Sequence, residues 1–203
     1  MGPAAAATAD LGRRIADCRL CAARFAETAT AHPPRPISWL SPTARILIAS
    51  QAPGARAHAS GLYFDDPSGD RLRDWLGLDR AAFYDRSRIA ILPMAFCFPG
   101  YDAKKNDLPP PRICAETWRA RALAAMPQIE LTLVIGLYAQ TWHLGHGRGR
   151  TLTETVRGWR THGPGIVPLP HPSWRNTAWI ARNPWFEEEL LPWLKTEIAR
   201  RLG

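Results

Sequence analysis

Residues 45–54 read RILIASQAPG, a short apolar run that ends in a proline–glycine turn. An uninterrupted run of apolar and β-branched side chains is typical of a strand buried on both faces, as in a parallel sheet. Gly54 permits a backbone turn that other residues resist, and Pro53, immediately before it, has its own φ angle fixed by its ring. The sequence therefore predicts a buried parallel strand at 45–50 with a tight turn at its carboxyl end.

Three further apolar runs predict strands at 89–93, 130–135 and 166–169. Helical spacing predicts helices over 9–27, 68–76, 115–125, 137–144 and 151–157, and a last helix from Asn183 to near Leu202 that Pro192 kinks or restarts. We expect long loops at 28–44 and 97–112 and disorder over 1–8. This alternation predicts the α/β class: a single domain over 1–203, built as a three-layer α/β/α sandwich with a four-stranded parallel sheet.

The chain is basic, with 26 Lys and Arg against 18 Asp and Glu. Such a balance favours an anionic partner such as nucleic acid, although the same arginines can simply keep a protein dispersed. No stretch approaches the ~20 apolar residues of a membrane span. The N-terminal MGPAAAATAD lacks the basic region of a secretory signal. These features predict a cytoplasmic protein.

The four cysteines are unevenly spaced. Cys18 and Cys21 form a CxxC pair, and Cys97 and Cys114 follow far downstream. In a reducing compartment such cysteines are more often ligands or free thiols than disulfides. Four thiolates can hold a zinc ion or a [4Fe–4S] cluster, and a buried cysteine can also serve as a small apolar side chain. The spacing favours a metal site and leaves the metal open.

Two segments follow predicted strands at the edge where parallel α/β folds bind ligands: QAPG after the first and LPHPSWRN after the last. His171 in the second can donate a hydrogen bond to an oxygen that gains negative charge in a transition state. Phe64 can stack on a planar base or pack in the core. Asp66 either positions a water molecule or precedes a helix cap at Ser68. His58 is a reserve catalytic candidate.

Together these motifs resemble the uracil-DNA glycosylase superfamily, most closely its iron–sulfur branch, called family 4, and related bacterial proteins. The resemblance rests on the order CxxC, QAPG, GLYF, NDLPPP between two distant cysteines, and LPHPS, and it covers nearly the whole chain. It implies a monofunctional DNA glycosylase that flips uracil, or a related deaminated base, out of DNA and hydrolyses its N-glycosidic bond. We expect DNA as the partner and a monomer in the bacterial cytoplasm.

The resemblance also implies roles for single residues. Cysteines at these four positions bind a structural [4Fe–4S] cluster in that branch, which favours the cluster over zinc. His171 would stabilise the departing base through its O2, and Gln51, Asp66 or His58 would orient water. Ser173 would contact a phosphate. The residues that would face the flipped base are Gln51, Ala52, Pro53, Gly54, Phe64 and His171, and those that would fill the gap left in DNA are Trp174 and Arg175.

The sequence departs from family 4 within these motifs. Family 4 has Glu where this chain has Gln51, and the uracil enzymes that have Gln there follow it with a water-orienting Asp, where this chain has Ala52. Family 4 also has a base-reading Asn on the second strand, where this chain has Pro93, and the loss of such a hydrogen-bond pair removes ~1–3 kcal/mol of discrimination. These differences support an alternative: a non-catalytic or altered-specificity member that binds DNA or a modified base.

Overall fold

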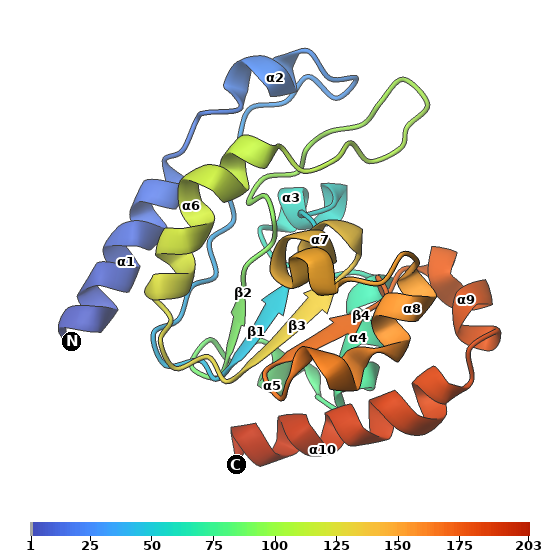
Figure 1. Cartoon of the computed structure of the whole chain (residues 1–203). Coiled ribbons are helices and arrows are strands. Elements are labelled where there is room, and N and C mark those ends of the chain that lie inside the picture. The colour runs from blue at the N-terminus through green and yellow to red at the C-terminus, as the bar shows by residue number, and fades with distance from the viewer. Residues whose placement is uncertain (1) are drawn as a thin grey trace.

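The computed structural model describes residues 2–203, and a parallel sheet forms its centre (Figure 1). The strands are β1 (Ile46–Ala49), β2 (Ile89–Ile91), β3 (Leu131–Ile135) and β4 (Ile166–Leu169). Their spatial order is β2-β1-β3-β4, and every neighbouring pair is parallel. Each strand lies within a run that the sequence predicted, so the α/β class and the four-stranded parallel sheet are confirmed.

Helices connect the strands and cover the sheet. They are α1 (Pro3–Ala16), α2 (Ala22–Ala26), α3 (Ala55–Ser60), α4 (Pro67–Leu76), α5 (Arg80–Phe83), α6 (Arg112–Ala124), α7 (Leu137–Leu144), α8 (Leu152–Arg157), α9 (Thr177–Ala181) and α10 (Leu191–Leu202). Short 3-10 turns occupy Gly145–Gly147, Trp159–His162 and Trp174–Asn176. In the described part of the chain, no helix combines the length and the apolar character that crossing a bilayer requires.

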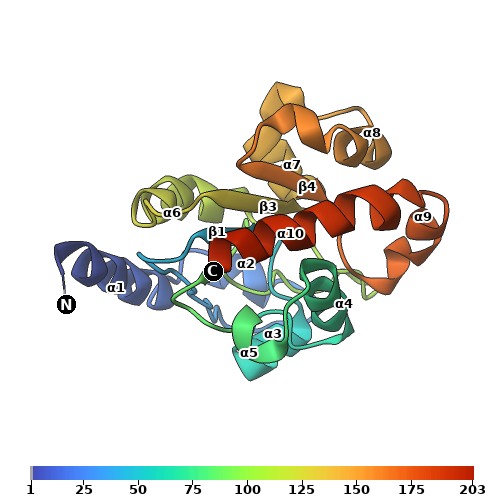
Figure 2. The same cartoon turned by 90° about the horizontal axis from the view of Figure 1, so that it is seen from below.

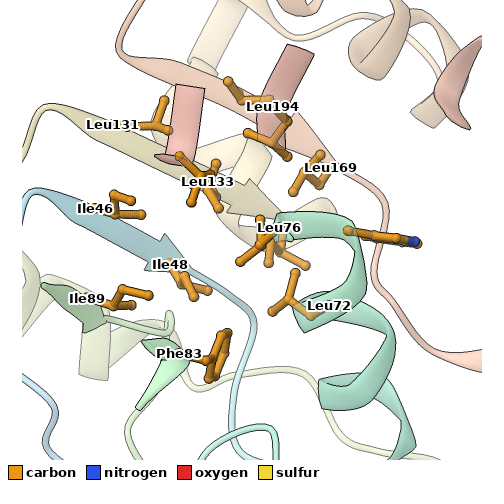
Figure 3. Close-up of a cluster of buried hydrophobic side chains, with 14 of the residues drawn as sticks. Ile46, Ile48, Leu72, Leu76, Phe83, Ile89, Leu131, Leu133, Leu169 and Leu194 are labelled. Atoms are coloured by element: carbon orange, nitrogen blue, oxygen red, sulfur yellow. The ribbon is translucent and has the colours of Figure 1, made fainter. Parts of the chain in front are cut away.

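The two faces of the sheet bury alternate side chains, because successive strand residues point in opposite directions. Ile46 and Ile48 of β1 pack with Leu72 of α4, Phe83 of α5 and Leu194 of α10 (Figure 3). On the opposite face, residues of β1 pack against α1 and α6, and residues of β3 pack with α7. Figure 2 shows α6 and α7 on one side of the sheet and α4 and α5 on the other. The three-layer sandwich is therefore confirmed.

The N-terminal region differs from the prediction of one helix over 9–27. The chain forms α1 and α2 instead, and the turn between them carries Cys18 and Cys21. Apolar spacing continues across this turn because Ile15, Cys18 and Phe25 line the same pocket. The structure describes a helix from Pro3 onward, where disorder over 1–8 was expected from the sequence. The alanine-rich start of α1 has high helix propensity, and Thr8 Oγ1 donates to the backbone oxygen of Ala125 at 3.0 Å.

Two helix starts also differ from prediction. Asp66, not Ser68, is the N-cap of α4, and its Oδ1 accepts a hydrogen bond from the Gly69 amide at 2.9 Å. Asn183 makes no side-chain cap; its amide donates to the backbone oxygen of Trp179 at 2.8 Å. Residues Phe186–Leu190 form a π-helix before α10, in which Pro192 lies in the first turn. Proline lacks the N–H that continues a helical ladder, so the predicted restart at Pro192 is observed.

Candidate functional site at the carboxyl edge of the sheet

The carboxyl ends of the strands open onto a cleft with a volume of about 740 Å³. Ala49 pairs with Val134, and Ile135 pairs with Leu169, so β1, β3 and β4 end at nearly the same level. The turn after β1 and the segment after β4 therefore face each other. The cleft is lined by segments 50–57, 63–71 and 171–176, together with Pro99, Asp107 and Leu108 from the second long loop. Its volume lies in the range of ligand-binding clefts in proteins.

The structure brings the predicted base-contacting and DNA-contacting residues, and the predicted catalytic Asp66, to this one cleft. They are Gln51, Ala52, Pro53, Gly54, Phe64, Asp66, His171, Ser173, Trp174 and Arg175. His58 and Pro93 are not among the described residues that line it. His58 instead packs at 5.1 Å from His32 and 5.8 Å from Phe98, measured between ring centroids. The backbone oxygen of Pro93 accepts a hydrogen bond from the buried Arg119.

His171 lies directly after β4, with one ring nitrogen already engaged. Its Nδ1 accepts a hydrogen bond from the Ser173 amide at 3.2 Å. The neutral ring therefore carries its proton on Nε2, which makes Nε2 a donor. Burial lowers the pKa of His171, and Arg175 lowers it further, against the opposing influence of the Asp66 and Asp107 carboxylates. The ring is consequently neutral at pH 7 and can donate a hydrogen bond without carrying a charge.

Arg71 of α4 holds the segment that carries His171. Its guanidinium donates to the backbone oxygen of Ser173 at 3.0 Å and to Thr177 Oγ1 at 3.2 Å. The side-chain amide of Asn176 donates to the backbone oxygen of His171 at 2.7 Å. The two Arg71 bonds join residues 171–177 to α4 on the other wall of the cleft, and the Asn176 bond holds the segment together internally. This role could not be predicted from the sequence, because Arg71 lies about one hundred residues before its partners.

Phe64 lines the cleft from a strained backbone position, with φ of +56°. A left-handed conformation at a residue other than glycine costs roughly 1–3 kcal/mol and is retained only where its surroundings enforce it. The Phe64 oxygen accepts a hydrogen bond from Arg73 at 3.2 Å. A Cβ atom at Gly69 would lie 1.7 Å from that oxygen, so α4 can approach only because glycine occupies this position. The surroundings of Phe64 therefore fix its backbone at the cleft wall.

Gly54 does not need the backbone freedom that the sequence suggested. Its φ is −80°, an ordinary value, and a Cβ atom added there would have no neighbour within 4 Å. The turn is anchored by its first residue, because the Gln51 oxygen accepts from the Ala95 amide at 3.2 Å. Since Gly54 lines the cleft, we conclude that its value lies in leaving space there.

The rim of the cleft is basic and includes an exposed aromatic side chain. Trp174 is 77% exposed, and the Arg175 guanidinium carbon lies 6.0 Å from the centre of its ring. Arg56, Arg71 and Arg175 contribute positive charge to the lining, against the two carboxylates of Asp66 and Asp107. This is the arrangement that a polyanion with flat bases would contact favourably.

The four cysteines lie away from the cleft, at another pocket that we call the cysteine pocket. Cys18 and Cys21 reach it from the turn after α1, Cys97 from the second long loop, and Cys114 from α6. The rest of its lining is apolar, and all four thiols are free. Burial raises the pKa of Cys97 to about 12 and that of Cys114 to about 11, and the neighbouring cysteines add to both shifts.

The cysteine pocket can be tested for the group it would fit. A single zinc ion needs four ligands at about 2.0–2.3 Å from one point. Among residues 2–203, no three Cys, His, Asp or Glu side chains gather closely enough to hold one metal ion. A [4Fe–4S] cluster is also held by four thiolates, but each binds a different iron atom, so the sulfurs stand farther apart. The donor set, four cysteines around one apolar pocket, is the kind that holds such a cluster.

Comparison with known families agrees with this geometry. A model of the Uracil DNA glycosylase superfamily matches residues 37–195, which is more than half of the chain. The match includes both walls of the cleft and ends before the last turns of α10, and it excludes Cys18 and Cys21. Members of this superfamily are generally DNA glycosylases, hydrolases that act on DNA. The chain thus belongs to the uracil DNA glycosylase superfamily.

Proposed function

We propose that this protein is a monofunctional DNA glycosylase that hydrolyses the N-glycosidic bond of uracil, or of a related deaminated base, in DNA. The observation that carries the proposal is His171, which stands opposite the turn after β1 with Nδ1 engaged and its Nε2 proton free. The base leaves as an anion when the glycosidic bond breaks. A neutral, fixed donor at the developing charge is the kind of group that stabilises such a transition state.

The remaining cleft residues support base flipping. A flipped base would stack on Phe64, whose backbone is fixed, and the open space over Gly54 would take the sugar and base. Ser173 and the basic rim would contact phosphates, giving affinity that falls as salt rises. Trp174 is exposed and next to Arg175, so it is well placed to enter the gap that the extruded nucleotide leaves.

We also propose that Cys18, Cys21, Cys97 and Cys114 hold a [4Fe–4S] cluster, with zinc as the alternative. When bound, the cluster would act as a structural cross-link. The support is the apolar pocket that all four free cysteines line together. The cysteines would then tie the α1–α2 turn and α6 to the second long loop, which reaches the cleft through Asp107.

The identity of the lesion is the open part of the proposal. Pro93, at the position of a base-reading Asn in family 4, lies outside the set of described residues that line the cleft. Another group must therefore read the edge of the base. The test is a panel of single- and double-stranded oligonucleotides that carry uracil, hypoxanthine or xanthine, incubated with cofactor-intact protein. Cleavage of at least one lesion supports the proposal. Binding of lesion DNA without cleavage of any would favour the non-catalytic alternative instead.

A further inference from the structure

The proposed reaction needs a group that activates water, and the turn after β1 does not supply a carboxylate. This turn carries Gln51 and Ala52. Of the described residues that line the cleft, only Asp66 and Asp107 bear carboxylates, and both contribute to the electrostatic environment of His171. The choice between them rests on what each carboxylate already does in the structure.

Asp66 is committed to the fold. Its Oδ1 accepts the hydrogen bond from the Gly69 amide that begins α4, and it stands beside the strained Phe64. A carboxylate that caps a helix is stabilised as the anion by the amide and by the helix dipole. The Asp66 carboxylate is therefore already engaged by the start of α4, which makes it a poor candidate for the group that binds and activates water.

Asp107 is fixed in its backbone but free in its side chain. It pairs with Tyr101 in an antiparallel bridge, and the Leu108 amide donates to the Gly100 oxygen at 2.9 Å. At the tip of this hairpin, Asp102 Oδ1 accepts from the amides of Lys104 and Asn106. The exposed Asp107 carboxylate, in contrast, has neither a hydrogen bond nor an ion pair with any described residue. It is held at the cleft without being used by the fold.

We propose that Asp107 is the catalytic carboxylate that orients and deprotonates the attacking water. This inference rests on the proposed function. The bond between C1′ and the base nitrogen breaks, and both electrons leave with the base, which His171 stabilises. The water oxygen forms a new bond to C1′, and its proton passes to the Asp107 carboxylate. That proton then goes to solvent, and the departed base takes up a proton from solvent.

The second long loop, which carries Asp107, is held at its base by contacts with the N-terminal segment. His32 Nε2 donates a hydrogen bond to the backbone oxygen of Phe98 at 3.0 Å, and the ring stacks on both Phe25 and Phe98. These contacts hold the base of the loop against the N-terminal segment. The cysteine pocket lies at the same end of the loop, through Cys97. The loop is thus supported from the side that faces away from the cleft, and Asp107 lies on the side that faces it.

The test is single-turnover cleavage of the preferred lesion by the wild-type protein and by Asp107→Asn. The matched control is Asp74→Asn, which makes the same change on α4 outside the cleft, where the Asp74 side chain is 78% exposed. General base catalysis contributes about 10²–10⁴-fold, so we expect Asp107→Asn to lose at least about 10²-fold in rate. DNA affinity and melting temperature should stay close to wild type. Formate should restore part of the rate to Asp107→Ala.

The other outcomes contradict either the role of Asp107 or the proposed function, and they can be told apart. If Asp107→Asn cleaves at the wild-type rate, the proposal fails and the proposed function stands. If the variant loses DNA affinity in proportion to its rate, Asp107 is a binding residue and the proposal also fails. Lost cleavage that formate does not restore in Asp107→Ala contradicts a role as proton acceptor. If the wild-type protein cleaves no lesion, the proposed function fails, and the inference fails with it.

Discussion

The cleft and the cysteine pocket are built in opposite ways. The walls of the cleft follow the ends of β1 and β4, and backbone hydrogen bonds of the sheet fix their positions. The cysteine pocket is assembled from a turn, a loop and a helix, and none of its four thiols is on a strand. The strand ends of the parallel sheet thus place the cleft segments, which Arg71 then holds together, whereas no strand carries a cysteine of the cysteine pocket.

The largest effect is expected from a substitution in the cleft that lowers the cleavage rate and leaves the fold intact. We expect His171→Ala to lower the single-turnover cleavage rate by about 10²–10³-fold, because removal of one donor to a developing negative charge costs roughly 2.7–4 kcal/mol. The melting temperature should change little. His146→Ala is the control, since His146 is exposed on the turn after α7. A His171→Ala protein that cleaves at the parental rate would show that the assigned donor is wrong.

The next largest effect is expected from substitutions in the cysteine pocket. We expect the wild-type protein to be brown with about four irons per chain, as a [4Fe–4S] cluster requires. Cys97→Ser and Cys114→Ser should lose the visible absorbance and melt at least several degrees lower, since each kcal/mol of stability is about 2–4 °C in a chain of this size. Metal analysis and thermal melts measure both. A colourless wild-type protein with one zinc per chain would support the alternative metal.

A smaller effect distinguishes the two roles considered for Asp66, which are capping α4 and orienting the attacking water. Because the Asp66 carboxylate caps α4, Asp66→Ala should destabilise the protein by ~1 kcal/mol, and Asp66→Asn should cost little, since asparagine is an equally good cap. Thermal denaturation of both variants measures the difference. If Asp66→Asn retains stability but loses about 10²-fold or more in cleavage rate while Asp107→Asn cleaves at the wild-type rate, Asp66 rather than Asp107 activates the water.

The smallest effect is the pH dependence of the cleavage rate, which tests the protonation state of His171 in the cleft. The pKa of His171 is lowered in the folded protein, chiefly by burial, so the neutral donor persists somewhat below the usual histidine pKa of 6.5. The cleavage rate assigned to this donor should hold as pH falls to about 6.5 and decline only at lower pH. Between the two pKa values the unfolded chain binds more protons, so this residue also lowers stability as pH falls through that range. If the cleavage rate already begins to fall above pH 7 as the pH is lowered, this assignment is wrong.

Much of the fold was predictable because its signals are local. The run RILIAS and its three counterparts have no alternation with polar residues, and that is what a strand covered on both faces requires. The same reasoning failed at 9–27, where apolar spacing continued through a turn. Spacing reports which residues face a common interior, and it cannot show whether the backbone between them stays helical.

The candidate site was predicted in part for the same reason. QAPG and LPHPS directly follow strands, so their position at one edge follows from a parallel sheet. Asp107 and Arg71 were missed. Asp107 lies in a long loop with no periodicity, and Arg71 acts on Ser173 and Thr177. Neither residue is adjacent in sequence to the segment whose environment it shapes.

The strands, their common direction and the two segments at the carboxyl edge could be predicted from the amino-acid sequence, because the side chains that specify these features are neighbours along the chain. Folding was needed to show which ring nitrogen of His171 is free, which carboxylate of the cleft is unengaged, and that four scattered cysteines share one pocket. Those properties depend on hydrogen bonds and contacts between distant segments, and such contacts exist only once the chain has packed.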